Sequence, residues 1–178
     1  MGYVATRCLM VILTPIVGAC SASWATRQSV EYPQTGTAPV RIYDVAIEPC
    51  ADRTAGVSGH DLSQEATNAL TAAVTKSKWL RMRDDAPYRL TCDVERFVPG
   101  SAGKRWLMPG WGSTVADVAV MVWDAKKQSV ITTVRSQATV AVGGLYTVDA
   151  EQSILKLAFE DGLRKLEKWA GTAKESAN

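Results

Sequence analysis

The stretch that decides the fold is Thr114-Val115-Ala116-Asp117-Val118-Ala119-Val120-Met121-Val122-Trp123. Its even positions from 116 to 122 are all Ala or Val, the period of a β-strand with one buried face. A short polar turn over residues 124–128 follows it. A second alternating run then extends over 130–142, with its predicted apolar face formed by Val130, Val134, Ala138, Val140 and Val142. The pair predicts an antiparallel hairpin.

Three further strands are expected before this hairpin. Residues 88–98 alternate well, and their predicted inward face is Tyr88, Leu90, Cys92, Val94 and Val98. Residues 40–47 form the first expected strand, ended by Pro49, and residues 79–82 form a short one. The glycine-containing stretch 51–59 is expected to be a loop.

Two helices complete the expected domain. Residues 61–77 and 150–169 each carry apolar side chains at helical spacing. Asp61 and Asp149 are suited to cap their N-termini. Runs of strands flanked by helices predict an α+β fold. We therefore expect a single two-layer domain over residues 40–170. It has a mainly antiparallel sheet of four to five strands with two helices on one face.

The N-terminal sequence predicts export. Arg7 precedes the apolar run 9–17, which is too short to span a membrane but suits a signal peptide. Val17-Gly18-Ala19-Cys20 resembles the bacterial lipobox. The resemblance implies that residues 1–19 are removed and that Cys20 carries lipid, and Ser21 in place of aspartate implies the outer membrane. Cleavage after Ala22 or Ala25 instead would release a secreted, non-lipidated periplasmic protein.

The segments on either side of the domain look irregular. Residues 20–39 are rich in Ser, Thr, Gln, Gly and Pro and predict a flexible tether. Residues 171–178 are polar and predict a frayed tail.

Cys50 and Cys92 are the two cysteines of the expected domain. An exported protein enters a compartment that permits disulfides, so these residues are candidates for a bond. Two buried free thiols are the alternative, because cysteine is often a small core residue.

Catalytic and cofactor sites are not indicated. His60 is the single histidine, and its spacing from the cysteines matches no zinc pattern. The carboxylate pairs Asp84-Asp85 and Asp93-x-Glu95 fall in a turn and on a polar strand face, where solvation is expected. The net charge is +2, which does not indicate the concentrated basic surface that binding of nucleic acid requires. We expect a protein with no metal, no cofactor and no enzymatic activity.

A loop rich in tryptophan is the most distinctive part of the expected domain. Two adjacent cations stand beside large apolar side chains in a stretch with glycine and proline. Such a loop could contact a membrane interface or a protein partner, or it could fold back and cap the sheet. The candidate contact residues are Lys104, Arg105, Trp106, Leu107 and Trp111.

Three motifs give the chain a family resemblance. They are Gly100-Ser101-Ala102-Gly103-Lys104-Arg105-Trp106, Gly110-Trp111-Gly112-Ser113 and Val118-Ala119-Val120-Met121-Val122-Trp123-Asp124. Over residues 40–168 the chain resembles an uncharacterised family of small Gram-negative envelope lipoproteins. More broadly, it is similar to auxiliary lipoproteins of envelope transport systems.

The resemblance implies a function in the cell envelope. We expect a lipid-anchored lipoprotein, facing the periplasm, that binds or supports another envelope component. The alternative is a lipid- or glycolipid-handling accessory of a transport system.

Overall fold

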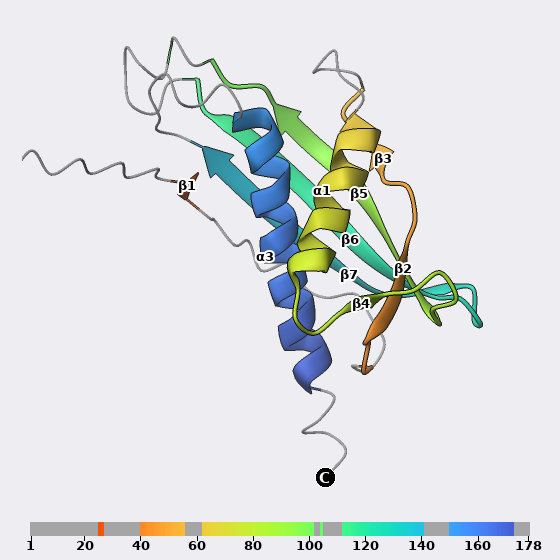
Figure 1. The fold of residues 1–178 in the computed structure, drawn as a ribbon. Helices are drawn as coiled ribbons and strands as arrows, with labels where there is room; N and C mark the ends of the chain where they lie inside the picture. The colour runs from red at the N-terminus through yellow and green to blue at the C-terminus, as the bar shows by residue number, and fades with distance from the viewer. Residues whose placement is uncertain are drawn as a thin grey trace, which may run out of the picture.

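The computed structural model describes residues 25–26, 40–55, 62–101, 104, 112–140 and 150–172. Two helices lie on one face of a single open sheet, which confirms the predicted α+β class (Figure 1). The sheet is centred on three long antiparallel strands, β5 (Tyr88–Val98), β6 (Thr114–Asp124) and β7 (Ser129–Val140).

Short strands extend this sheet at both edges. β2 (Asp44–Ile47) and β3 (Ala51–Asp52) pair in parallel with β5, and β4 (Arg81–Met82) pairs in parallel with β2. β1 (Ala25–Thr26) pairs antiparallel with β7. The strand order is β1-β7-β6-β5-β2-β4, with β3 beside β5. The sheet therefore has more strands than the predicted four to five, because the two-residue strands β1 and β3 were not predicted.

The expected first strand and the loop after it need correction. Of the predicted strand 40–47, only Asp44–Ile47 is paired as a strand. Ala51–Asp52, expected in a loop, form β3 because the chain returns to β5 after Pro49. The backbone N–H of Glu48 and that of Arg53 donate to the carbonyls of Leu90 and Val94, on either side of this return.

Two β-bulges change which side chains face inward. Between Val94 and Arg96 the register with β6 shifts by one residue, so Phe97 is buried and the predicted Val98 is not. A second shift, between Val122 and Trp123, places Ile131 in the core and leaves Val130 39% exposed, although Val130 was predicted to face inward. An extra residue in one strand reverses the alternation beyond it.

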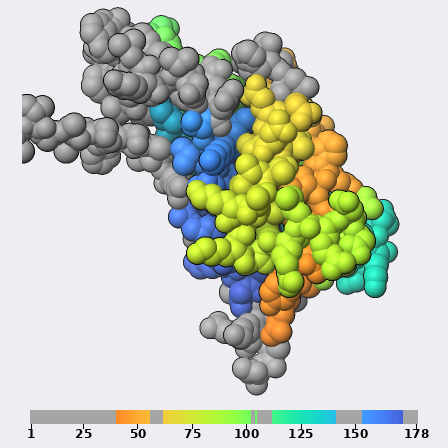
Figure 2. Space-filling view, viewed as in Figure 1, coloured from red at the N-terminus to blue at the C-terminus, as the bar shows by residue number. Residues whose placement is uncertain are grey.

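The core lies between the sheet and the helices α1 (Leu62–Lys76) and α3 (Ala150–Thr172). The two helices lie side by side over this face, and their side chains close the space between them (Figure 2). The largest fully buried side chains come from both layers, and they include Leu70, Leu90, Val118, Ile154, Phe159 and Leu166. At about 25 cal/mol per Å² of apolar surface, this burial is the main force holding the layers together.

The two ends of the sheet differ, and the difference matters for the candidate site. At one end, named here the loop end, β5 finishes at Val98, β6 begins at Thr114 and β7 finishes at Val140. At the other, the hairpin end, residues 125–128 join β6 to β7. Asp124 organises this turn by accepting hydrogen bonds from the backbone N–H groups of Lys127 and Lys126, at 3.0 and 2.9 Å, which lower the pKa of Asp124.

Candidate functional site

The predicted contact loop leaves and rejoins the sheet at the loop end. Ser101 and Gly112 form its base, where the backbone N–H of Ser101 donates to the carbonyl of Gly112 at 3.0 Å. Gly112 has a φ of 71°, and a Cβ there would stand 2.8 Å from the Ser101 carbonyl oxygen. Only glycine fits this backbone without strain. The second glycine of the Gly110-Trp111-Gly112 motif is therefore required for the loop base.

Most of the candidate contact residues lie outside the described part of the chain. Lys104 is described and its side chain is exposed. The other four candidates, Arg105, Trp106, Leu107 and Trp111, fall in the undescribed stretch between the two sides of the loop base.

Cys50 and Cys92 lie together in the structure and their sulfur atoms are bonded, with a Cα–Cα distance of 4.5 Å. Cys92 is on the inward face of β5, and Cys50 lies between β2 and β3. Two hydrogen bonds fix Cys50 beneath α1. Its N–H donates to Thr67 Oγ1 at 2.9 Å, and its carbonyl accepts from Ser63 Oγ. The bond thus joins the parallel edge of the sheet to its centre, under a helix.

The N-terminal segment also reaches the loop end. Ala25 pairs with Val140 and Thr26 with Thr139. Cys20 and the rest of the predicted tether 20–39 lie outside the described residues. Because β1 is antiparallel to β7, Ala25, its first residue, lies nearer the loop end than Thr26.

A buried aspartate on α3 is a feature that the sequence patterns did not predict. Asp161 is 1% exposed and accepts a hydrogen bond from Ser136 Oγ on β7 at 2.8 Å. Lys165 Nζ lies 3.2 Å from the carboxylate, and Arg164 is paired with it as well. Burial raises the pKa of Asp161, but the Ser136 and Lys165 hydrogen bonds and the two cations outweigh it, so the net pKa is lowered. Asp161 lies three residues after Ala158, on the apolar side of the helix. This spacing is the signal from which its burial could have been predicted.

This cluster joins the helix layer to the sheet. Lys165 also donates to the backbone carbonyl of Arg135 at 3.1 Å, so one helix turn is bonded to β7 at two points. Each polar group here has a partner, which is what burial requires.

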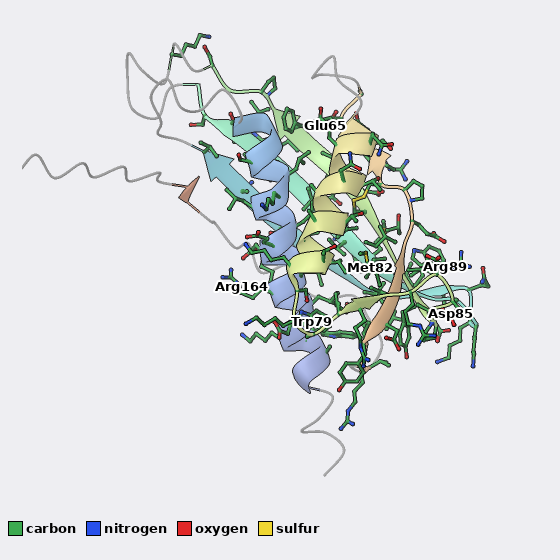
Figure 3. The ribbon with its side chains drawn as sticks, viewed as in Figure 1. Glu65, Trp79, Met82, Asp85, Arg89 and Arg164 are labelled. Carbon is green, nitrogen blue, oxygen red and sulfur yellow. A yellow bond between two sulfur atoms is a disulfide. The ribbon has the colours of Figure 1, made fainter. Side chains whose placement is uncertain are left out.

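A shallow depression lies where the C-terminal end of α1 meets α3. It encloses about 360 Å³, and its lining includes Trp79, Lys76, Glu160 and Arg164. Trp79 and Arg164 lie on the same side of the molecule, near the end of α1 (Figure 3). Lys76 and Glu160 already form an ion pair across it at 2.9 Å. The depression is open, and its lining carries side chains of both charges.

The face of the sheet away from the helices carries paired charges. Arg53 pairs with Asp93 at 3.3 Å, and Arg135 with Glu95 at 2.9 Å. At the hairpin end Asp85 accepts two hydrogen bonds of 3.0 Å from Arg83, which lower the pKa of Asp85 (Figure 3). The carboxylates considered for acid–base chemistry are thus engaged with arginines, apart from Asp84.

The described residues offer neither a metal site nor a membrane-spanning helix. They contain no cluster of three or more potential metal ligands, and His60 is not among them. None of the described helices is long and apolar enough to cross a membrane.

Comparison with known proteins gives likeness in fold. Neither a family model nor a curated protein sequence matches this chain. Among solved structures, a point variant of PelC from Paraburkholderia phytofirmans, a dodecamer, is 20% identical, with a TM-score of 0.51 over 75% of this chain and 96% of PelC. The hypothetical protein CT253 from Chlamydia trachomatis is 14% identical, with a TM-score of 0.51 over 72% of this chain and 98% of CT253.

Lipoproteins also occur among the matches. A minor lipoprotein from Acinetobacter baumannii is 10% identical, with a TM-score of 0.37 over 72% of this chain and 93% of that protein. The chain is similar in structure to small lipoproteins of Gram-negative bacteria, PelC among them, as the sequence resemblance predicts. At these identities the likeness extends to the fold and not to a specific role.

Proposed function

We propose that this chain is a non-enzymatic lipoprotein of the bacterial envelope that is anchored through Cys20 and binds or supports another envelope component. The observation that carries the proposal is the pairing of Ala25 with Val140. The stretch of chain from Cys20 to Ala25 spans at most roughly 17 Å. Lipid on Cys20 would therefore hold the loop end of the sheet beside the membrane, on the periplasmic side of the outer membrane.

The contact loop belongs to the same end of the domain. Its base at Ser101 and Gly112 adjoins the ends of β5 and β6, and Lys104 is exposed there. Tryptophans beside cations suit both a lipid headgroup region and the centre of a protein interface. We propose that Lys104, Arg105, Trp106, Leu107 and Trp111 supply the contact, to a partner that itself lies close to the membrane.

Cys20→Ser tests the anchor. The wild-type chain should fractionate with membranes and gain the mass of a diacylglyceryl group and acyl chain. The variant should lose both, because one acylated cysteine is the only lipid site proposed. A wild-type chain of unmodified mass, starting after Ala22 or Ala25 and recovered in the periplasm, would instead establish the secreted, non-lipidated alternative.

Affinity purification from solubilised membranes tests the contact. We expect the wild-type chain to retain an envelope protein that the double variant Trp106→Ser/Trp111→Ser loses while keeping its melting temperature. Lys127→Ser, at the exposed hairpin end, is the matched control and should retain the partner. Loss of folding in the tryptophan variant would show that the loop caps the sheet. Because PelC is a dodecamer, the same preparation should be sized for further copies of this chain.

The second candidate, a lipid- or glycolipid-handling accessory, requires an apolar cleft between sheet and helices. In the described part of the chain that space is filled by side chains such as Leu90, Val118 and Phe159, each fully buried. Co-purifying lipid that survives Cys20→Ser would favour this candidate over the first.

A further inference from the structure

β7 is the last long strand on its side of the sheet, and its outer edge is the side that faces away from β6 (Figure 1). Among the described residues, strand pairing on this outer edge is limited to β1, which pairs with Thr139 and Val140. The residues of β7 before Thr139 pair with β6 on their other side. The outer edge therefore accepts an antiparallel strand, and the described chain uses only one end of it.

Hydrogen bonds elsewhere in the sheet fix the direction of the β7 backbone groups. The carbonyl of Val94 accepts from the N–H of Arg53, so it points towards β3. Because backbone groups alternate along an antiparallel strand, those of Asp93 point towards β6. Asp93 pairs with Ala119, whose own groups therefore point towards β5. Ala119 pairs in turn with Arg135, so the groups of Arg135 point away from β6.

The same alternation gives the direction of two further residues. The register of β7 is regular from Thr133 to Gln137, so the N–H and C=O groups of these two residues also point outward. Lys165 agrees with this direction, because its Nζ donates to the carbonyl of Arg135 at 3.1 Å. No described strand lies opposite Thr133 or Gln137 on the outer edge. An added strand would satisfy these groups by extending the sheet.

The side of α3 beside the outer edge is positively charged. Asp161 faces β7 from this side and is paired with both Arg164 and Lys165. Lys168 is exposed and follows Lys165 by three positions, which places the two on the same side of the helix. One carboxylate therefore stands among three cations, and this side of α3 keeps a surplus of positive charge.

The same side of α3 also offers an apolar contact. Leu157 precedes Asp161 by four positions and is partly buried against the core. Because α3 packs over β6 and β7, some side chains of a strand added beyond β7 would face this side of the helix. An acidic side chain near Lys168 and an apolar one near Leu157 would complement it.

A second copy of this chain suits the outer edge less well. Two β7 strands that pair antiparallel about a two-fold axis would place their α3 helices side by side on one face of the joined sheet. Lys165 and Lys168 of one copy would then face the same residues of the other, and like charges at close range oppose association. The charge of α3 therefore favours a partner with acidic residues.

We propose that the outer edge of β7 binds an extended, acidic segment of another envelope protein, which adds to the sheet as an antiparallel strand beside Thr133 and Gln137. The envelope location of this partner rests on the proposed function. The surface itself is separate from the contact loop and does not depend on lipid at Cys20.

Amide hydrogen exchange in the isolated full chain tests whether the outer edge is open. The N–H groups of Thr133 and Gln137 should exchange at least about a hundredfold faster than those of Val134 and Ser136, which point towards β6. Equal protection at every protein concentration would show that the chain covers its own edge. Protection that increases with concentration would show that a second copy covers it. Either result would overturn the proposal.

Photo-crosslinking in cells of the native host tests the partner. A p-benzoylphenylalanine in place of Gln137 should form adducts with one segment of another envelope protein. Thr133→Pro in the same chain removes an N–H of the outer edge and leaves the bonds to β6 in place, so the melting temperature should be kept. The adduct yield should fall at least about fivefold, because main-chain hydrogen bonds supply the affinity of an added strand. Thr133→Val keeps the N–H and is the matched control.

Two charge reversals on α3 test the acidic character of the segment. Lys168→Glu should lower the adduct yield at least about threefold, because it replaces attraction with repulsion. Lys156→Glu changes an exposed residue on a different side of the helix and should leave the yield unchanged. Adducts only to a second copy or within the chain, no adduct, or a yield that Thr133→Pro leaves unchanged would overturn the proposal.

This proposal and the proposed function can fail separately. None of these substitutions alters Cys20 or the contact loop. If the outer edge binds nothing, membrane fractionation and the partner lost in Trp106→Ser/Trp111→Ser should still be observed. If the anchor or the loop contact fails instead, fast exchange at Thr133 and Gln137 should remain.

Discussion

Ser136 on β7 donates a 2.8 Å hydrogen bond to Asp161 on α3, and both residues are almost completely buried. Asp161→Ala would leave this hydroxyl and Lys165 without their carboxylate. We expect the free energy of unfolding to fall by about 3 kcal/mol, measured by urea denaturation. Glu167→Ala, an exposed position on the same helix, should change it by less than about 0.5 kcal/mol. A comparable loss in both variants would mean that the cluster has no special role.

The same carboxylate predicts a pH dependence. The folded-state pKa of Asp161 is lowered below its ordinary value of 3.8, so its stabilising contribution is fully present above that value. The contribution is lost as the pH falls through the folded-state pKa. Between pH 5 and pH 2 the wild-type chain should lose more stability than Asp161→Asn, whose side chain does not titrate. Parallel curves for the two proteins would contradict this prediction.

Thr132 is fully buried on the core side of β7, and its hydroxyl has no hydrogen-bond partner among the described residues. Replacing it with valine keeps the shape and removes the unsatisfied polar group. Thr132→Val should therefore raise the free energy of unfolding by about 1 kcal/mol. Ser136→Ala, on the same face of the same strand, removes a satisfied hydroxyl and should lower it. Destabilisation by both substitutions would indicate that Thr132 bonds to something.

The Cys50–Cys92 bond should contribute about 4 kcal/mol through the restricted unfolded chain, given the separation of 42 residues. Reduction of the wild-type protein should lower its melting temperature by well over ~10 °C. The double variant Cys50→Ala/Cys92→Ala should melt at the lower temperature with or without reductant. Titration of two free thiols in the native, oxidised protein would support the alternative of separate buried cysteines.

Gly112 and Gly171 provide a matched pair of substitutions. Gly112→Ala places a methyl group at a φ of 71° and against the Ser101 carbonyl, so it should cost about 2 kcal/mol. Gly171 lies in α3, where an added Cβ would meet nothing within 4 Å, and Gly171→Ala should be neutral or slightly stabilising. Equal melting temperatures for the two variants would contradict the tight loop base at Ser101 and Gly112.

Local periodicity accounts for what could be predicted of the fold. The long strands β5, β6 and β7 and both helices lie within a few residues of their predicted positions, since each depends on the spacing of its own side chains. Where one extra residue enters a strand, as at Glu95 and Ile131, that spacing is locally satisfied by either register. The predictions for Val98 and Val130 were therefore wrong.

The sequence by itself determined the two-layer plan and the hairpin, because each depends on the spacing of neighbouring residues. Only the tertiary structure decided which distant residues meet. The pairing of Ala25 with Val140, the Cys50–Cys92 bond and the burial of Asp161 against Ser136 each join residues far apart in the chain. Such contacts depend on how the layers pack and on strand order, and no local pattern specifies either.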